Sequence, residues 1–117
     1  MSRSRESAKL LPPPRPGDVL RLQIFANTAI TQERLAGAMK VSRYSINQLV
    51  NNRRAVTPEM ALRLAKATST TPEFWLNLQR NFDLFEAKKK LSPVLHKVEI
   101  VRSPQRPEAM FVRLAKS

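Results

Sequence analysis

Two nearly identical helix starts constrain the fold of this chain more than any other feature. The tripeptide Thr-Pro-Glu occurs at residues 57–59 and again at residues 71–73. In each copy the threonine suits the N-cap and the proline suits the first helical position. The glutamate suits the positive end of the helix dipole. Apolar residues follow each start at helical spacing, as in Trp75, Leu78 and Phe82. The pattern predicts two consecutive helices, the second of which is the longest in the chain.

The residues before position 57 predict three more helices. Residues 16–18 (Pro-Gly-Asp) open a short one, and Thr31 and Ser42 are good N-caps for the next two. Ser92-Pro93 is expected to end the last helix, because proline pushes the preceding residue out of the helical region. With only two glycines in the chain, the sequence predicts an all-α fold, a five-helix bundle over residues 16–91.

The two ends of the chain differ in composition from this central segment. Residues 1–15 combine serines, basic residues and three successive prolines, which indicates a basic arm that either enters a DNA groove or is a solvated tail. Residues 92–117 hold two β-prone runs, at 98–101 and 110–114. A two-stranded hairpin is marginal in water. We therefore expect this extension to contact a dimer mate or a toxin, with a mobile tail as the alternative.

Composition excludes several classes of protein. The chain has 117 residues, enough for one domain, and it has no cysteine and only one histidine, His96. Disulfides, cysteine-based zinc sites and multi-histidine metal sites are therefore excluded, and we expect no cofactor and no enzyme. Neither a membrane helix nor a signal peptide is predicted, so we expect a cytoplasmic protein without a membrane partner. The net charge of +12 favours nucleic acid as the partner.

Residues 31–54 predict a helix-turn-helix, in which two short helices join through a turn at Lys40 and Val41. The second helix of such a motif lies in the DNA major groove. If its apolar residues face the core, four polar side chains face solvent and are the candidate base readers. These are Arg43, Tyr44, Asn47 and Gln48.

The chemistry of these side chains suits base recognition. Arginine can bond guanine O6 and N7 together, and asparagine or glutamine can bond adenine N6 and N7. Gln32 lies at a helix N-terminus, which favours phosphate, and Arg53 and Arg54 follow the second helix as candidate backbone contacts. The alternative is that any bundle helix presents polar residues outward. The charge of +12 favours DNA over that alternative.

Residues 57–84 (TPEMALRLAKATSTTPEFWLNLQRNFDL) closely resemble the signature of HigA-type antitoxins, a branch of the Cro/repressor-like XRE helix-turn-helix family. The segment PEFWLNLQ, residues 72–79, is typical of this branch. Residues 16–20 resemble the family's proline-glycine opening, and residues 51–55 fall where the family has the loop after its recognition helix. Lys40 and Asn52 replace two usual glycines, so Lys40 is expected at positive φ.

The resemblance implies a DNA-binding antitoxin of a bacterial type II toxin–antitoxin module. Such proteins are dimers that repress their own operon at a palindromic operator and bind a RelE-like toxin, which cleaves mRNA on the ribosome. Carried over position by position, the resemblance implies the same four base readers. It also implies a set of residues that contact the DNA backbone. The backbone set it implies is Gln32, Ser42, Ser45, Asn51 and Arg53.

Two rival functions stay open at this stage. The first is a stand-alone repressor of the same fold with no toxin partner. The net charge bears on this choice, because RelE-like toxins tend to be basic. An antitoxin of charge +12 must then bind such a toxin through a local acidic or apolar patch. The second is a general RNA- or anion-binding protein. Single-strand readers offer exposed aromatic rings for stacking, and Tyr44 is the one candidate here.

Overall fold

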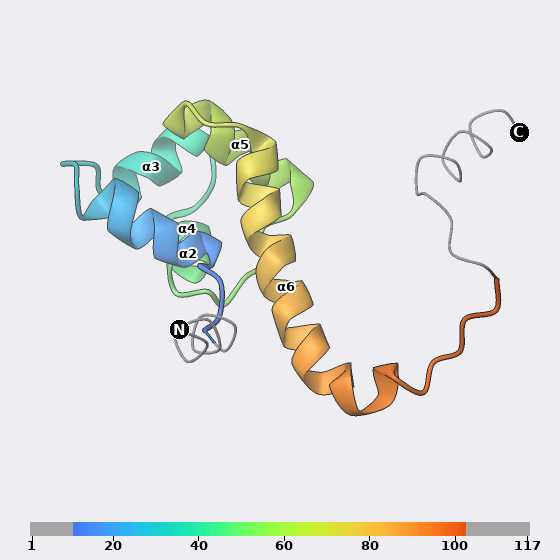
Figure 1. Ribbon diagram of the computed structural model, residues 1–117. Coiled ribbons are helices and arrows are strands. Elements are labelled where there is room, and N and C mark those ends of the chain that lie inside the picture. Colours follow the sequence, from blue (N-terminus) through green and yellow to red (C-terminus); the bar gives the residue numbers. More distant parts are fainter. Residues whose placement is uncertain (1–10, 103–117) are drawn as a thin grey trace, which may run out of the picture.

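The computed structural model describes residues 11–102 and shows a helical body from which one long helix extends (Figure 1). The first helix runs as α2 (Pro16–Val19) directly into the π-helical η1 (Leu20–Phe25). The helices α3 (Gln32–Met39), α4 (Arg43–Val50), α5 (Pro58–Thr68) and α6 (Pro72–Leu95) follow in order. Counting α2 and η1 as one helix, the five-helix, all-α prediction is confirmed, with no strand among the described residues.

Each predicted N-cap makes its hydrogen bond. The hydroxyl of Thr31 accepts from the backbone N–H of Arg34 at 3.0 Å, and that of Ser42 accepts from Ser45 at 3.1 Å. Thr57 and Thr71 cap α5 and α6 in the same way. These bonds satisfy donors that a helix start leaves without an internal partner, so the helix boundaries follow from local sequence.

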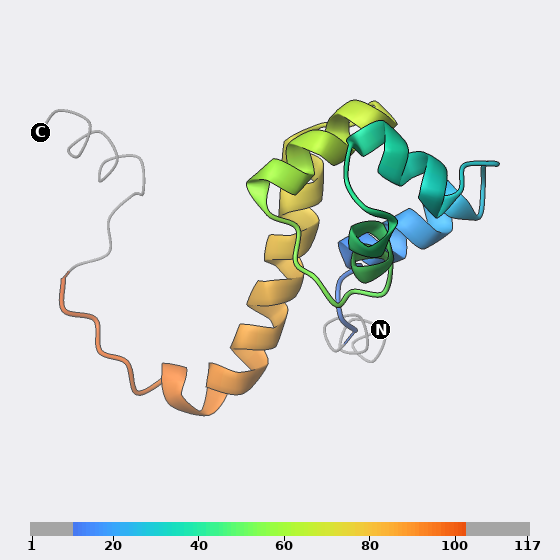
Figure 2. The same cartoon turned by 180° about the vertical axis from the view of Figure 1, so that it is seen from behind.

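The core lies where α2, α3, α4, α5 and the first turns of α6 meet (Figure 2). Its largest fully buried side chains are Trp75, Leu20, Ile46, Leu49 and Leu64. The small Ala36 is buried on the inner face of α3, where α4 crosses. Trp75 donates from Nε1 to the Thr70 hydroxyl at 2.7 Å, so its one polar atom has a partner in the exposed turn before α6.

The prediction that Ser92-Pro93 ends the last helix is wrong. Helix α6 continues through Pro93 to Leu95. Residues 87–101 are all exposed, so water can bond the Lys89 carbonyl that the missing proline N–H leaves without a helical donor. The last turn of α6 bends aside from the preceding helix in Figure 1, as expected for an internal proline.

The sequence leaves the extension open between a β-hairpin of its two β-prone runs and a tail, and the hairpin has no support in the described part of the extension. Residues 98–101 form no strand and are exposed. A strand requires a neighbouring strand for its backbone hydrogen bonds, and the second β-prone run, at 110–114, lies outside the described residues. Residues 1–10 of the predicted arm also lie outside them. Arg15, the last residue of that arm, is the N-cap of α2 and is half-buried.

Candidate nucleic-acid interface

Helix α4 presents one apolar face to the core and one polar face to solvent. Ile46, Leu49 and Val50 are buried, as the sequence predicts. On the other side of the helix Arg43, Tyr44 and Asn47 are exposed and Gln48 is half-buried, with Tyr44 64% exposed. The four candidate base readers therefore share the outer surface of α4.

Two further groups of side chains flank this surface. On one flank the side-chain amide of Asn47 donates to Gln32 of α3, with 3.5 Å between the nitrogen and oxygen. On the other flank Arg54 donates to the Ser45 hydroxyl at 3.0 Å, and that hydroxyl lies 3.0 Å from the hydroxyl of Ser42. Since residues 45 and 47 project from α4 about 160° apart, the two groups lie on opposite sides of the helix.

The remaining predicted backbone contacts, Asn51 and Arg53, lie where α4 ends. The side-chain amide of Asn51 donates to the Asn47 carbonyl at 2.9 Å and so caps the helix C-terminus. The backbone N–H of Arg53 donates to the Gln48 carbonyl at 2.9 Å, and its side chain is exposed. The structure thus brings all ten predicted site residues to α4 and its two neighbours in the chain.

The turn between α3 and α4 is held from outside the motif. Lys40 has φ 59° and ψ 42°, which confirms the left-handed conformation expected of it. Arg63 of α5 donates to the Met39 carbonyl at 2.7 Å and more weakly to that of Lys40, and Glu59 holds the same guanidinium at 3.2 Å. Sequence reasoning missed Arg63, and its i, i+4 spacing from Glu59 was the only local signal.

The end of α4 is also joined to the start of the first helix. Asn52, at φ 56°, accepts from the Gly17 N–H at 3.0 Å and donates to Asp18 at 3.1 Å. Arg21 donates to the Val50 carbonyl at 2.7 Å and pairs with Asp18. These bonds fix the position of the recognition helix relative to the body.

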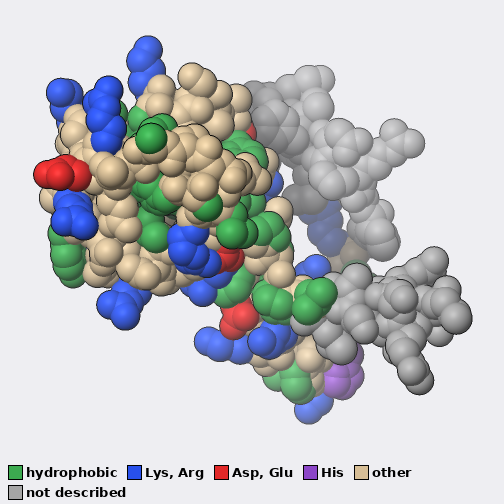
Figure 3. Space-filling model, turned by 90° about the vertical axis from the view of Figure 1, so that its left-hand side faces the viewer, with side chains coloured by type: hydrophobic (Ala, Val, Ile, Leu, Met, Phe, Trp, Pro, Cys, Tyr) green, Lys and Arg blue, Asp and Glu red, His purple; other side chains and the backbone are tan. Residues whose placement is uncertain are grey.

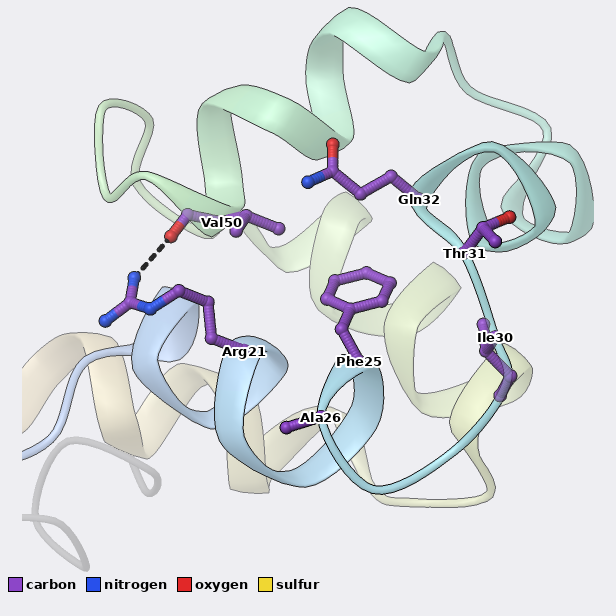
Figure 4. A pocket seen from close by; sticks show the side chains of 7 residues that line it. All are labelled: Arg21, Phe25, Ala26, Ile30, Thr31, Gln32 and Val50. Atoms are coloured by element: carbon purple, nitrogen blue, oxygen red, sulfur yellow. Dashed lines mark hydrogen bonds between the residues drawn. The ribbon is translucent and has the colours of Figure 1, made fainter.

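A pocket of about 470 Å³ opens between the first helix and the start of α3 (Figure 4). In Figure 4 the ring of Phe25 points into it, with the Gln32 side chain above the ring and the Arg21 guanidinium bonded to Val50 at one side. The pocket places a guanidinium and the N-terminus of α3 beside the Gln32–Asn47 pair. The N-terminus of α3 favours a phosphate, whereas the Arg21 guanidinium is already bonded to Val50 and paired with Asp18.

Known proteins share this arrangement. A helix-turn-helix family model matches residues 29–75. The uncharacterized HTH-type transcriptional regulator YbaQ of Escherichia coli is 42% identical over 79 residues, covering 68% of this chain and 70% of that protein. Antitoxin HigA-1 of Vibrio cholerae is 36% identical over 74 residues, covering 63% and 70%. The structure of Pseudomonas aeruginosa antitoxin HigA with the higBA promoter matches with a TM-score of 0.70 at 32% identity, covering 77% of this chain and 99% of that one.

The chain belongs to the XRE family of helix-turn-helix proteins, which includes the HigA-type antitoxins. It is a DNA-binding regulator of the antitoxin-like kind. Basic side chains are spread over the face of this XRE-family protein seen in Figure 3, and acidic ones are sparse there. A surface of that charge suits a polyanion.

Within residues 11–102, no helix combines the length and hydropathy needed to cross a membrane. The same residues include no cluster of three or more metal-ligating side chains of the histidine, cysteine or carboxylate type.

Asp18 is the acidic group on which the junction between the first helix and α4 depends. Partial burial alone would raise the pKa of its carboxyl group. Hydrogen bonds from the Arg15 N–H, Arg21 and Asn52, together with the charge of Arg21, outweigh burial and hold the pKa below its ordinary value. A carboxyl group with a lowered pKa stabilises the folded state while it is ionised.

An Asp18→Asn variant should therefore be less stable than wild type in a manner that depends on pH. We expect it to lose about 1–2 kcal/mol of unfolding free energy at pH 7. The loss should shrink as the pH falls from about 4, where the carboxyl group of the unfolded chain becomes protonated, through the lower pKa of the folded state, where the native interactions are lost as well. Urea unfolding of both proteins at pH 7 and pH 3 measures this. A difference that stays the same at both pH values would contradict it.

Proposed function

We propose that this protein is a sequence-specific DNA-binding antitoxin that represses its own operon and neutralises a RelE-like mRNA-cleaving toxin. One observation carries the DNA part. The outer surface of α4 holds four polar side chains. One of them, Asn47, bonds Gln32 on one side of the helix, and Arg54 bonds Ser45 on the other side. That spacing is what a helix in the major groove requires, since bases lie in front of it and a phosphate strand lies on each side.

Within this proposal each side chain has a separate role. Arg43 bonds guanine, Asn47 and Gln48 bond adenine, and Tyr44 contacts a thymine methyl or a phosphate. Backbone phosphates are bound by Gln32, Ser42, Ser45, Asn51, Arg53 and Arg54. The exposure of Arg43 and Asn47 and the half-exposure of Gln48 support the first set, since a base reader must be reachable by the edge of a base pair.

We further propose that the protein binds a palindromic operator as a homodimer, because one recognition helix contacts too few base pairs for useful specificity. The exposed side of α6 supports a mate. Leu84, Leu91 and Val94 are each about half exposed and, with Ala87, follow a 3-4-3 spacing along the helix. Such a stripe favours a second helix over water.

A mobility-shift titration with the native upstream DNA at ~150 mM salt tests the proposal. We expect a dimer, identified by light scattering, that binds the operator much more tightly than a scrambled duplex of the same length. Equal affinity for the two duplexes would reject sequence-specific repression. It would leave a general anion-binding protein.

A stand-alone repressor is the second candidate, and the charge of +12 favours it because RelE-like toxins tend to be basic as well. Co-expression separates the two functions. If a small toxin gene adjoins this one, growth arrest by that toxin should be relieved by this protein. If relief fails while operator binding is normal, the stand-alone reading is correct.

Loss of base contacts and loss of phosphate contacts should give different binding profiles. Arg43→Ala and Gln48→Ala are each expected to cost about 1–3 kcal/mol on the operator and much less on scrambled DNA. Arg53→Ala should weaken binding to both duplexes alike, because a phosphate contact carries no sequence information. Fluorescence anisotropy with the two duplexes measures the ratio of the affinity for the operator to the affinity for scrambled DNA. An unchanged ratio in Arg43→Ala would show that α4 is oriented differently on DNA.

A further inference from the structure

A second, smaller pocket lies beside the loop that follows α4. Its lining includes two proposed phosphate contacts, Arg53 and Arg54, together with Arg15, to which the proposed function assigns no role. Its volume is about 240 Å³, and three arginines from two separate segments of the chain contribute to its wall. The pocket is lined by Arg15, Asn52, Arg53, Arg54, Ala55, Gln79 and Asp83. Residues 52–55 come from the loop, Gln79 and Asp83 from α6, and Arg15 from the N-cap of the first helix.

Arg15 is fixed in place before any ligand arrives. Its guanidinium carbon lies 3.9 Å from the centroid of the Phe82 ring, and its Nη2 donates to the Asn52 carbonyl at 3.3 Å. An arginine held by an aromatic ring and a carbonyl loses little conformational entropy when it binds an anion. Arg15, the last residue of the predicted arm, is therefore held against the helical body.

The pocket adjoins the surface that α4 presents to DNA. Arg54, in the pocket wall, also donates to Ser45 on one flank of that surface. Gln32 marks the other flank through Asn47. A duplex whose major groove receives α4 would therefore bring one phosphate strand to Gln32 and the other to the side on which the pocket lies.

The charge of the pocket suits a single phosphate group. Three guanidinium groups line it against one carboxylate, that of Asp83, which accepts from Gln79 at 3.0 Å. Arginine matches phosphate geometry with paired N–H donors. We propose that this pocket binds one backbone phosphate flanking the bases that α4 contacts, and that Arg15 is a DNA-binding residue. The proposal rests on the proposed function, since it requires that α4 enters the major groove.

The salt dependence of operator binding tests the role of Arg15. In Arg15→Ala, the loss of one phosphate contact should make the plot of log binding constant against log [salt] less steep, by about 0.9 in slope. Arg80→Ala is the matched control, because Arg80 is an exposed arginine of α6 outside this pocket. Its slope should equal that of wild type. Asp83→Asn should tighten operator binding, since it removes the one negative charge from the pocket wall and leaves Arg15 in place.

Duplexes with one neutral methylphosphonate linkage locate the phosphate itself. At one position flanking the contacted bases, the neutral linkage should weaken wild-type binding by at least about tenfold. The same linkage should have almost no effect on Arg15→Ala, because its partner is already missing. Equal losses in both proteins at every position, or an unchanged salt slope in Arg15→Ala, would overturn the proposal.

The remaining outcomes separate this inference from the proposed function. If wild type does not distinguish operator from scrambled DNA, the proposed function fails first. If it does and Arg15→Ala keeps the full salt slope, only the phosphate pocket is rejected. A free-anion site would show as thermal stabilisation by inorganic phosphate in wild type and not in Arg15→Ala, with the salt slope unchanged, and this too would overturn the assignment to DNA.

Discussion

A Gly17→Ala variant should unfold at a clearly lower denaturant concentration than wild type. A methyl group at position 17 would meet the backbone carbonyls of Leu49 and Val50 and the side-chain oxygen of Asn52, with 2.7 Å to the Val50 oxygen. Backbone carbonyls at a helix end cannot rotate aside as a flexible side chain can. We expect a loss of about 1–3 kcal/mol or more, and weaker operator binding, because the end of α4 must shift.

Gly37→Ala is the control for this prediction. Gly37 lies within α3, and a methyl group there would meet no atom within 4 Å. Alanine in a helix interior is favoured over glycine by about 0.5–1 kcal/mol, so this variant should be more stable than wild type. Urea unfolding followed by the fluorescence of Trp75, the only tryptophan in the sequence, measures both variants. If both substitutions changed the midpoint in the same direction, close packing at Gly17 would not be the cause.

Trp75→Ala should have the largest effect on stability of any single substitution considered. The side chain is 1% exposed, belongs to the core cluster and packs edge-on against Phe74 with 5.1 Å between ring centroids. Removing such a side chain leaves a cavity and costs about 3–5 kcal/mol. Because small domains have only about 5–15 kcal/mol of stability in total, the variant should be partly unfolded at 37 °C.

Trp75→Phe separates packing from hydrogen bonding in this effect. Phenylalanine retains most of the apolar volume but cannot donate to Thr70, so we expect a smaller loss than in the alanine variant. Thermal unfolding followed by circular dichroism suits both variants, since neither contains tryptophan. If Trp75→Ala melted within a few degrees of wild type, the side chain would not be part of the core in solution.

The features that the sequence predicts correctly depend on neighbouring residues. The caps at Thr31, Ser42, Thr57 and Thr71 each bond a backbone N–H three residues ahead, so the motif contains all its own information. The buried face of α4 follows from helical periodicity in the same way. The positive φ of Lys40 was expected from a resemblance to a family, since lysine itself gives no signal for it.

The features that escaped sequence analysis depend on residues far apart in the chain. Arg15 and Asn52 meet across 37 positions, and Arg63 reaches the turn at Met39 across 24. No local pattern predicts such contacts, because the residues next to Arg15 and Arg63 do not distinguish them from the other arginines of the chain. At Pro93 the error is the opposite one, because the local rule that proline ends a helix does not hold there. Near an exposed helix end, solvent can bond the carbonyl that the proline leaves without a helical donor.

The bonds from Arg63 to the turn have a consequence for how this regulator can change over evolution. The angle between α3 and α4 depends on a side chain of α5, a helix that presents no proposed base reader. We expect substitutions at Arg63 or Glu59 to tilt α4 and change which base pairs it can reach, with every proposed base reader unaltered. Operator preference can therefore drift without substitution at the DNA surface, and a selection for new specificity should randomise α5 together with α4.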